Sequence, residues 1–136
     1  MPPIPARMSD LPVRAGRALP WVAGENGAFE TINNKRAFDS EKFGLCQACG
    51  HPLDEGMAVA IKRAVTQDRN AGGLPLHPEC AKYAAAACPH LQHGEWVAVA
   101  VRGWTPTGIG PGIDWRPGDV ISKTPLDQIR SGAVTW

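Results

Sequence analysis

The chain has 136 residues, and its 15 glycines and 13 prolines make up about 21% of it, against about 12% in an average protein. Because 43% of the residues are hydrophobic and the net charge is only +1, wholesale disorder is excluded, and one domain with a modest core fits the length. The longest apolar runs are far shorter than the ~18 residues of a membrane-spanning helix, and no third of the chain is strongly basic or acidic.

The N-terminal part of the chain is predicted to contain an extended arm and a hairpin. Residues 1–20 hold five prolines and show little periodicity, so we expect them to form the arm. Two apolar runs, 21–23 and 28–32, flank an Asn-Gly pair, which is a good hairpin signal. The ordered domain is therefore expected to begin at residue 21 and to continue to residue 136.

A short helix is predicted to follow this hairpin. Asn33 or Asn34 can cap its start, and Gly44 stops it after Phe43.

The central part of the chain predicts a strand and the best-defined helix. Residues 57–65 have the composition of a strand, and the polar residues 66–73 are expected to form a hairpin tip behind it. Pro78 suits the first position of a helix, His77 lies at its cap, and Pro89 stops it. One face of this helix is apolar and has small side chains, which would let another element approach closely; it is formed by Tyr83, Ala84, Ala87 and Cys88.

The C-terminal part is predicted to contain two further strands. Residues 95–104 form the clearest late strand, and residues 118–122 form another. Between them, eight of the sixteen residues 103–118 are glycine or proline, which indicates an irregular loop.

Two close pairs of cysteine and histidine are the strongest chemical signal. Cys46 and Cys49 are followed, after a gap of 27 residues, by His77 and Cys80. Zinc prefers four nitrogen or sulfur ligands in a tetrahedron, often supplied as two such pairs. Gly50 allows a tight knuckle after the first pair, and the second pair lies across the start of a helix, as in the treble-clef arrangement. We therefore predict one structural Zn²⁺, whose binding energy also supports folding.

Other cysteines and histidines compete for this assignment. Cys88 lies eight residues beyond Cys80, which is about 12 Å along a helix and too far for a shared ion. It is expected to be a buried thiol, while His51, His90 and His93 remain possible replacements for a predicted ligand.

Two enzyme readings of the same residues are weaker. A thioredoxin-like role for Cys46 and Cys49 lacks the βαβ pattern that surrounds such motifs. The segment His77-Pro78-Glu79 has the elements of a zinc deaminase, but its order relative to the Cys-x-x-Cys is reversed. A fourth ligand at Cys80 would also occupy the position that a catalytic water needs.

Two groups of residues are candidates for binding a partner. Lys62, Arg63 and Arg69 lie on or near the expected hairpin tip and could contact phosphates. Trp104 and Trp115 lie in the loop-rich C-terminal segment 103–136, where tryptophan can anchor an interface.

A set of short motifs is spread over about the first 90 residues: Ile4-Pro5-Ala6-Arg7-Met8, Leu11-Pro12-Val13, Pro20-Trp21, Leu45-Cys46-Gln47-Ala48-Cys49-Gly50 with Pro52-Leu53, Leu76-His77-Pro78-Glu79-Cys80-Ala81 with Tyr83-Ala84, and Cys88-Pro89. In combination they resemble a family of small phage and prophage proteins from bacteria. The resemblance implies a mobile-element setting and the zinc module, and it implies no reaction. Between residues 57 and 73 the chain departs from the family pattern, which has a further cysteine there.

The sequence thus predicts an α+β fold: a single small domain around a treble-clef-like zinc module at residues 44–93. The favoured function is a non-enzymatic accessory protein that binds a host or phage macromolecule, a protein rather than a nucleic acid. A zinc enzyme acting on nucleotides or nucleic acid and a minor virion or assembly component are the alternatives. The start of the chain has no apolar signal segment, so we expect a cytoplasmic protein of the bacterial host cell, with virion association as a further possibility.

Overall fold

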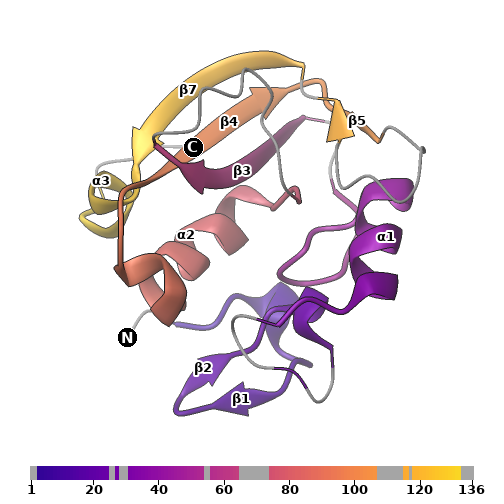
Figure 1. Cartoon of the computed structure of the whole chain (residues 1–136), viewed down its shortest axis with the longest axis vertical. Helices are drawn as coiled ribbons and strands as arrows, with labels where there is room; N and C mark the ends of the chain where they lie inside the picture. Colours follow the sequence, from indigo (N-terminus) through magenta and orange to yellow (C-terminus); the bar gives the residue numbers. More distant parts are fainter. Residues whose placement is uncertain are drawn as a thin grey trace.

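A three-stranded antiparallel sheet with one helix packed on it forms the centre of the fold (Figure 1). The computed structural model describes residues 3–24, 27, 31–53, 56–64, 74–106, 115, 116 and 118–132. The sheet has the strand order β3-β4-β7, with β3 at Met57–Arg63, β4 at Trp96–Arg102 and β7 at Asp119–Pro125, and the helix is α2, Pro78–Ala87. The predicted α+β class and the small single domain are therefore confirmed.

Small side chains let α2 lie close to the sheet. In the pairing of β3 with β4, Val59 lies opposite Ala100, so both point to the same face of the sheet. This pair belongs to one buried cluster with Ala81 and Ala85 of α2, both of which are fully buried. Val99 and its neighbours on the opposite face form a second buried cluster. The alanine-rich composition of the helix thus has a packing role.

The segment predicted to be an extended arm is folded against the domain. It contains the 3-10 helix η1 (Ala6–Met8) and a two-stranded hairpin of β1 (Val13–Arg14) and β2 (Arg17–Ala18). The prolines suggested an unpaired chain, but Met8 and Leu19 are only 2% and 1% exposed. Burial of these apolar side chains stabilises the folded segment, and the local sequence pattern gives no sign of it. The prediction of an extended arm is therefore wrong for the described residues.

One buried hydrogen bond attaches this N-terminal segment to α2. The Ala18 amide donates to the Tyr83 hydroxyl over 2.9 Å, and Tyr83 is 4% exposed. Replacing Tyr83 with phenylalanine leaves the buried amide without its acceptor. We expect Tyr83→Phe to lower the free energy of unfolding by about 1–3 kcal/mol, measured by urea denaturation. An unchanged midpoint would show that the amide finds another acceptor.

The prediction of a hairpin formed by residues 21–23 and 28–32 is wrong for its first strand. Residues Trp21–Ala23 form the 3-10 helix η2 instead of a strand, while residues 28–30 lie outside the described residues. The amides of Trp21 and Val22 donate to the Ala48 and Gln47 carbonyls of the cysteine turn, at 2.8 and 2.9 Å. These tertiary hydrogen bonds select a turn where the local apolar pattern indicated a strand.

The helix expected before the cysteines is confirmed. Helix α1 spans Asn34–Phe43, and the side chain of Asn33 accepts a hydrogen bond from the Arg36 amide at its start. Gly44 ends it in the left-handed conformation, with φ of 68°. Both boundaries agree with the capping residues in the sequence.

Strand β3 pairs mainly with β4 and not with the chain that follows the expected hairpin tip. It pairs along its whole length with β4, whereas the chain returning before α2 makes only a single bridge, between Val59 and Leu76. The expected tip, residues 66–73, lies outside the described residues. The long apolar run of β4 competes for β3 more effectively than a short return segment can.

The remaining elements cover the ends of the sheet. The 3-10 helix η3 (Pro89–Gln92) follows α2, and β5 (Thr105–Pro106) pairs with β6 (Trp115–Arg116) inside the segment expected to be irregular. Helix α3, Leu126–Arg130, was not predicted; the Arg130 side chain donates to the carbonyls of Ala85 and Leu91. The described part of the chain holds no helix whose length and apolar character would let it cross a membrane.

Candidate metal centre

Four side chains from two distant parts of the chain meet in the interior. The ligand atoms of Cys46, Cys49, His77 and Cys80 all lie within 4.8 Å of one another. Each of these residues is at most 5% exposed. Around a tetrahedral zinc with Zn–S bonds of about 2.3 Å, neighbouring sulfurs lie about 3.8 Å apart, so a small contraction completes the site. The four residues are therefore close enough to hold a metal ion, and the donor set fits zinc.

A tight turn presents the first two ligands. Leu45 and Pro52 form an antiparallel bridge at its base, and the Cys46 amide donates to the His51 carbonyl over 2.9 Å. Gly50 closes the turn with φ of 78°. Glycine adopts this left-handed conformation readily, whereas a residue with a side chain is strained there. The His51 amide then points at the Cys49 sulfur, 3.5 Å away. The turn therefore has the form expected of a knuckle.

The start of α2 presents the other two ligands. Pro78 occupies the first turn, and His77 is the cap residue with an extended backbone. The His77 amide lies 3.4 Å from the Cys46 sulfur and donates to it. Cys80 lies three residues further on, in the same turn of helix and on the same side. The bridge between Val59 and Leu76 fixes the chain immediately before this pair.

The imidazole of His77 is oriented by groups around its outer nitrogen. Its Nδ1 lies 3.3 Å from the Cys49 sulfur, so this is the nitrogen that faces the cluster. Its Nε2 lies 3.0 Å from the Pro52 carbonyl oxygen, which can accept the Nε2 proton. A proton on Nε2 that is donated to this carbonyl would leave Nδ1 free to bind metal.

A positive charge lies beside the same ring. The Arg7 guanidinium is 3.1 Å from His77 Nε2 and also pairs with the Glu79 carboxylate. Three thiolates and one Zn²⁺ together carry a charge of −1, so a nearby guanidinium offsets that charge. The N-terminal segment thereby supports the metal centre, a role for which the sequence pattern offered no signal.

The four side chains shift one another's pKa values. Hydrogen bonds with Cys46 and Cys80 hold the pKa of the Cys49 thiol far below its ordinary value. Burial lowers the pKa of His77, but hydrogen bonds with Cys46 and Cys49 outweigh this and raise it to about 10. Hydrogen bonds with Cys46 and Cys49, together with burial, raise the pKa of Cys80. A divalent cation bound by the four side chains would take the place of the protons on His77 and Cys80.

The competing ligands lie outside this cluster. His51, His90 and His93 are exposed, and Cys88 is half-buried after the end of α2. His90 instead makes an edge-to-face contact with Trp96. The four residues brought together are the four selected by their spacing.

The predicted binding residues are dispersed and stay predictions. Lys62 and Arg63 lie in β3 and not at a tip, and the Arg63 guanidinium stacks over the Trp96 ring at 4.9 Å. Trp104 is half-buried and packs against both buried clusters beside the sheet. Arg69 and the side chain of Trp115 lie outside what the structure describes.

The fold and the site define an α+β protein with a buried Cys3His cluster compatible with zinc. Comparison with protein families, with curated protein sequences and with solved structures gives no match to this chain.

Proposed function

We propose that the chain is a non-enzymatic, zinc-binding accessory protein of a phage or another mobile element, and that it binds a protein partner. The observation that carries this proposal is the complete and buried donor set of Cys46, Cys49, His77 and Cys80. Four protein ligands complete the tetrahedron, so such a zinc has no position for a water or a substrate. The metal then holds the fold together, and function resides on the surface.

The local framework supports a treble-clef-like zinc module. A knuckle supplies the first ligand pair, and the first turn of α2 supplies the second. The bridge between Val59 and Leu76 stands where that arrangement has a hairpin. The mobile-element setting rests on the motifs around these same ligands and at the N-terminus, which resemble those of phage and prophage proteins.

A protein partner is favoured over nucleic acid by the use of the basic side chains. The net charge is only +1, and several described guanidinium groups are engaged within the chain. Arg36 donates to the Trp21 carbonyl, Arg130 to carbonyls of α2 and η3, and Arg63 stacks on Trp96. Nucleic-acid binding normally requires a basic surface that is available to phosphates.

Metal analysis of the purified protein tests the first part of the proposal. We expect one zinc per chain by elemental mass spectrometry, and a tetrahedral thiolate spectrum after replacement of zinc by Co²⁺. A five-coordinate cobalt spectrum, or exchangeable water on the metal, would instead support a zinc enzyme. Protein without stoichiometric metal would overturn the proposal.

Affinity capture from bacterial host cells tests the second part. The tagged wild-type chain is expected to retain a protein at a fixed ratio after nuclease treatment. A Trp104→Ala variant that still carries one zinc is the matched comparison, because it tests the C-terminal segment as the contact surface. Recovery of nucleic acid alone would overturn the protein-partner proposal.

A further inference from the structure

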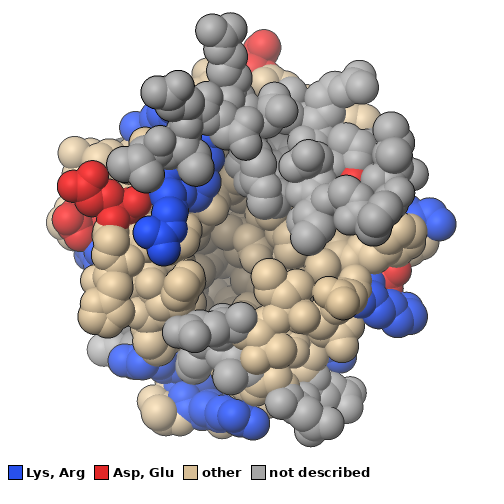
Figure 2. All heavy atoms as spheres, in the orientation of Figure 1, with Lys and Arg blue, Asp and Glu red and all other residues tan. Residues whose placement is uncertain are grey.

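A cavity of about 540 Å³ lies beside α2. Its walls come from the N-terminal segment, the knuckle, α2, η3 and the ends of β3 and β4. Its lining includes Gln47, Leu76, Tyr83, Cys88, His90 and Trp96. Figure 2, in the orientation of Figure 1, shows a hollow near the centre of the molecule, walled largely by uncharged residues.

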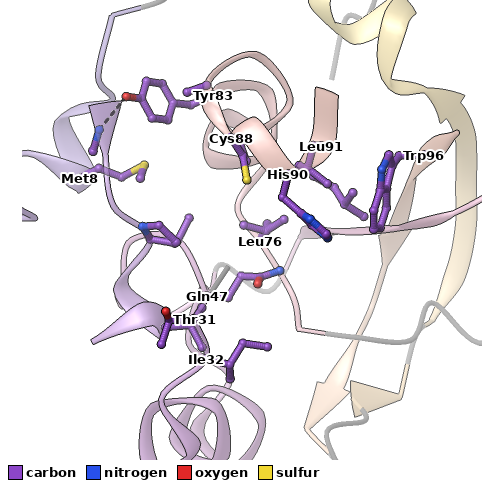
Figure 3. A pocket seen from close by; sticks show the side chains of 17 residues that line it. Met8, Thr31, Ile32, Gln47, Leu76, Tyr83, Cys88, His90, Leu91 and Trp96 are labelled. Atoms are coloured by element: carbon purple, nitrogen blue, oxygen red, sulfur yellow. Dashed lines mark hydrogen bonds between the residues drawn. The ribbon is translucent and has the colours of Figure 1, made fainter. Parts of the chain in front are cut away.

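The apolar helix face predicted from sequence is one wall of this cavity. Tyr83, Ala84, Ala87 and Cys88 all line it, so their small side chains leave a space where we had expected close packing by another element. The Cys88 sulfur points into this space, toward Leu76 (Figure 3). The volume falls within the range of about 300–1,000 Å³ that is typical of small-molecule sites.

The lining determines the charge of a suitable occupant. None of the described lining residues is Asp, Glu, Lys or Arg. A charged ligand would therefore lose its hydration without meeting an opposite charge inside, which is costly. Aromatic and aliphatic carbons dominate the walls, and Tyr83, Trp96 and His90 offer ring surfaces.

One polar atom in the wall lacks a partner. The Tyr83 hydroxyl already accepts from the Ala18 amide, as the dashed line in Figure 3 shows, and Gln47 Nε2 donates to the Leu74 carbonyl over 2.8 Å. Gln47 Oε1 makes no hydrogen bond with the described part of the chain. A ligand that carries an N–H or O–H group could donate to this oxygen.

We propose that this cavity binds a neutral, mainly aromatic small molecule that donates a hydrogen bond to Gln47 Oε1. The proposal goes beyond the zinc-binding and partner-binding roles. It does not depend on the identity of a protein partner. The metal centre still stabilises the cavity, because Ala48 lies between two ligands and Leu76 precedes His77. A wall fixed in this way is preorganised, which reduces the entropy lost on binding.

A matched pair of fluorescent probes tests the chemistry of the occupant in the zinc-loaded full chain. N-phenyl-1-naphthylamine is neutral, aromatic and carries one N–H donor, and anilinonaphthalene sulfonate has the same skeleton with an added negative charge. We expect the neutral probe to bind with one molecule per chain, and the sulfonate to bind at least about tenfold more weakly. No binding of the neutral probe, or equal binding of both, would overturn the proposal.

Two variants on α2 test the location. Ala84→Phe places a ring inside the cavity and should weaken the neutral probe at least about tenfold, since a filled site has no room for it. Ala86→Phe is the control, because Ala86 is equally half-buried on the same helix but does not line the cavity. Equal loss in both variants, or no loss in Ala84→Phe, would place the probe elsewhere and overturn the proposal.

Alkylation of Cys88 gives a readout in the unmodified chain. Saturating N-phenyl-1-naphthylamine should slow the reaction of Cys88 with iodoacetamide, followed by peptide mass spectrometry. An unchanged rate would overturn the proposal, even if Ala84→Phe failed to fold. Protection by an apolar peptide, with none by the aromatic probe, would favour a protein segment as the occupant and would also overturn it.

Discussion

Replacing Cys80 with serine is expected to remove the bound zinc and to unfold the domain. Cys80 is fully buried, and a serine hydroxyl at that position is a poor ligand for zinc. Structural zinc sites supply about 10–16 kcal/mol at pH 7, which is as large as the whole stability of a typical domain, about 5–15 kcal/mol. Elemental analysis should therefore show no stoichiometric zinc, and circular dichroism should show no cooperative unfolding transition. We expect Cys49→Ser to behave in the same way.

Cys88→Ser is the matched control for these variants. It makes the same chemical change at a half-buried cysteine outside the cluster. This variant should retain one zinc per chain and a cooperative transition. If Cys80→Ser kept its zinc and its fold, or if Cys88→Ser lost zinc to the same extent, the assignment of the four ligands would be wrong.

The Cys3His cluster could be predicted from sequence because the geometry within each ligand pair is set locally. Two residues between Cys46 and Cys49 specify a knuckle, and the offset from His77 to Cys80 is one helical turn. The capping residues around α1 and α2 likewise act within a few positions of themselves. The spacing within each pair is therefore readable from a few neighbouring residues, whereas the meeting of the two pairs depends on the tertiary structure.

The features that sequence reasoning missed depend on contacts between distant residues. Arg7 reaches His77 across 70 positions, and the Tyr83 hydroxyl binds an amide 65 positions away. Strand β3 pairs with β4 because the seven-residue apolar strand offers more hydrogen bonds than the chain before α2. Local patterning contains no information on such choices. The N-terminal segment was therefore expected to be an extended arm, whereas its described residues contact His77 and form one wall of the cavity.

Gly50→Ala is expected to destabilise the zinc-loaded protein by about 2–5 kcal/mol. Gly50 has φ of 78°, where a side chain costs roughly 1–2 kcal/mol. A methyl group there would also lie 2.7 Å from the Trp21 ring, closer than packed atoms tolerate. Displacing that ring would add about 1–3 kcal/mol and would disturb the stacking of Arg36 on it, at 5.3 Å. Urea denaturation in the presence of excess zinc measures the loss.

Gly16→Ala separates the two contributions. Gly16 has nearly the same φ, 77°, but a methyl group added there meets no atom within 4 Å. This variant should therefore lose only the conformational part, roughly 1–2 kcal/mol. The difference between the two variants then reports the contact between the knuckle and η2, the place where tertiary structure overrode the expected hairpin. Equal losses would mean that the Trp21 ring moves aside without cost, and its contact with the knuckle would then contribute no measurable stability.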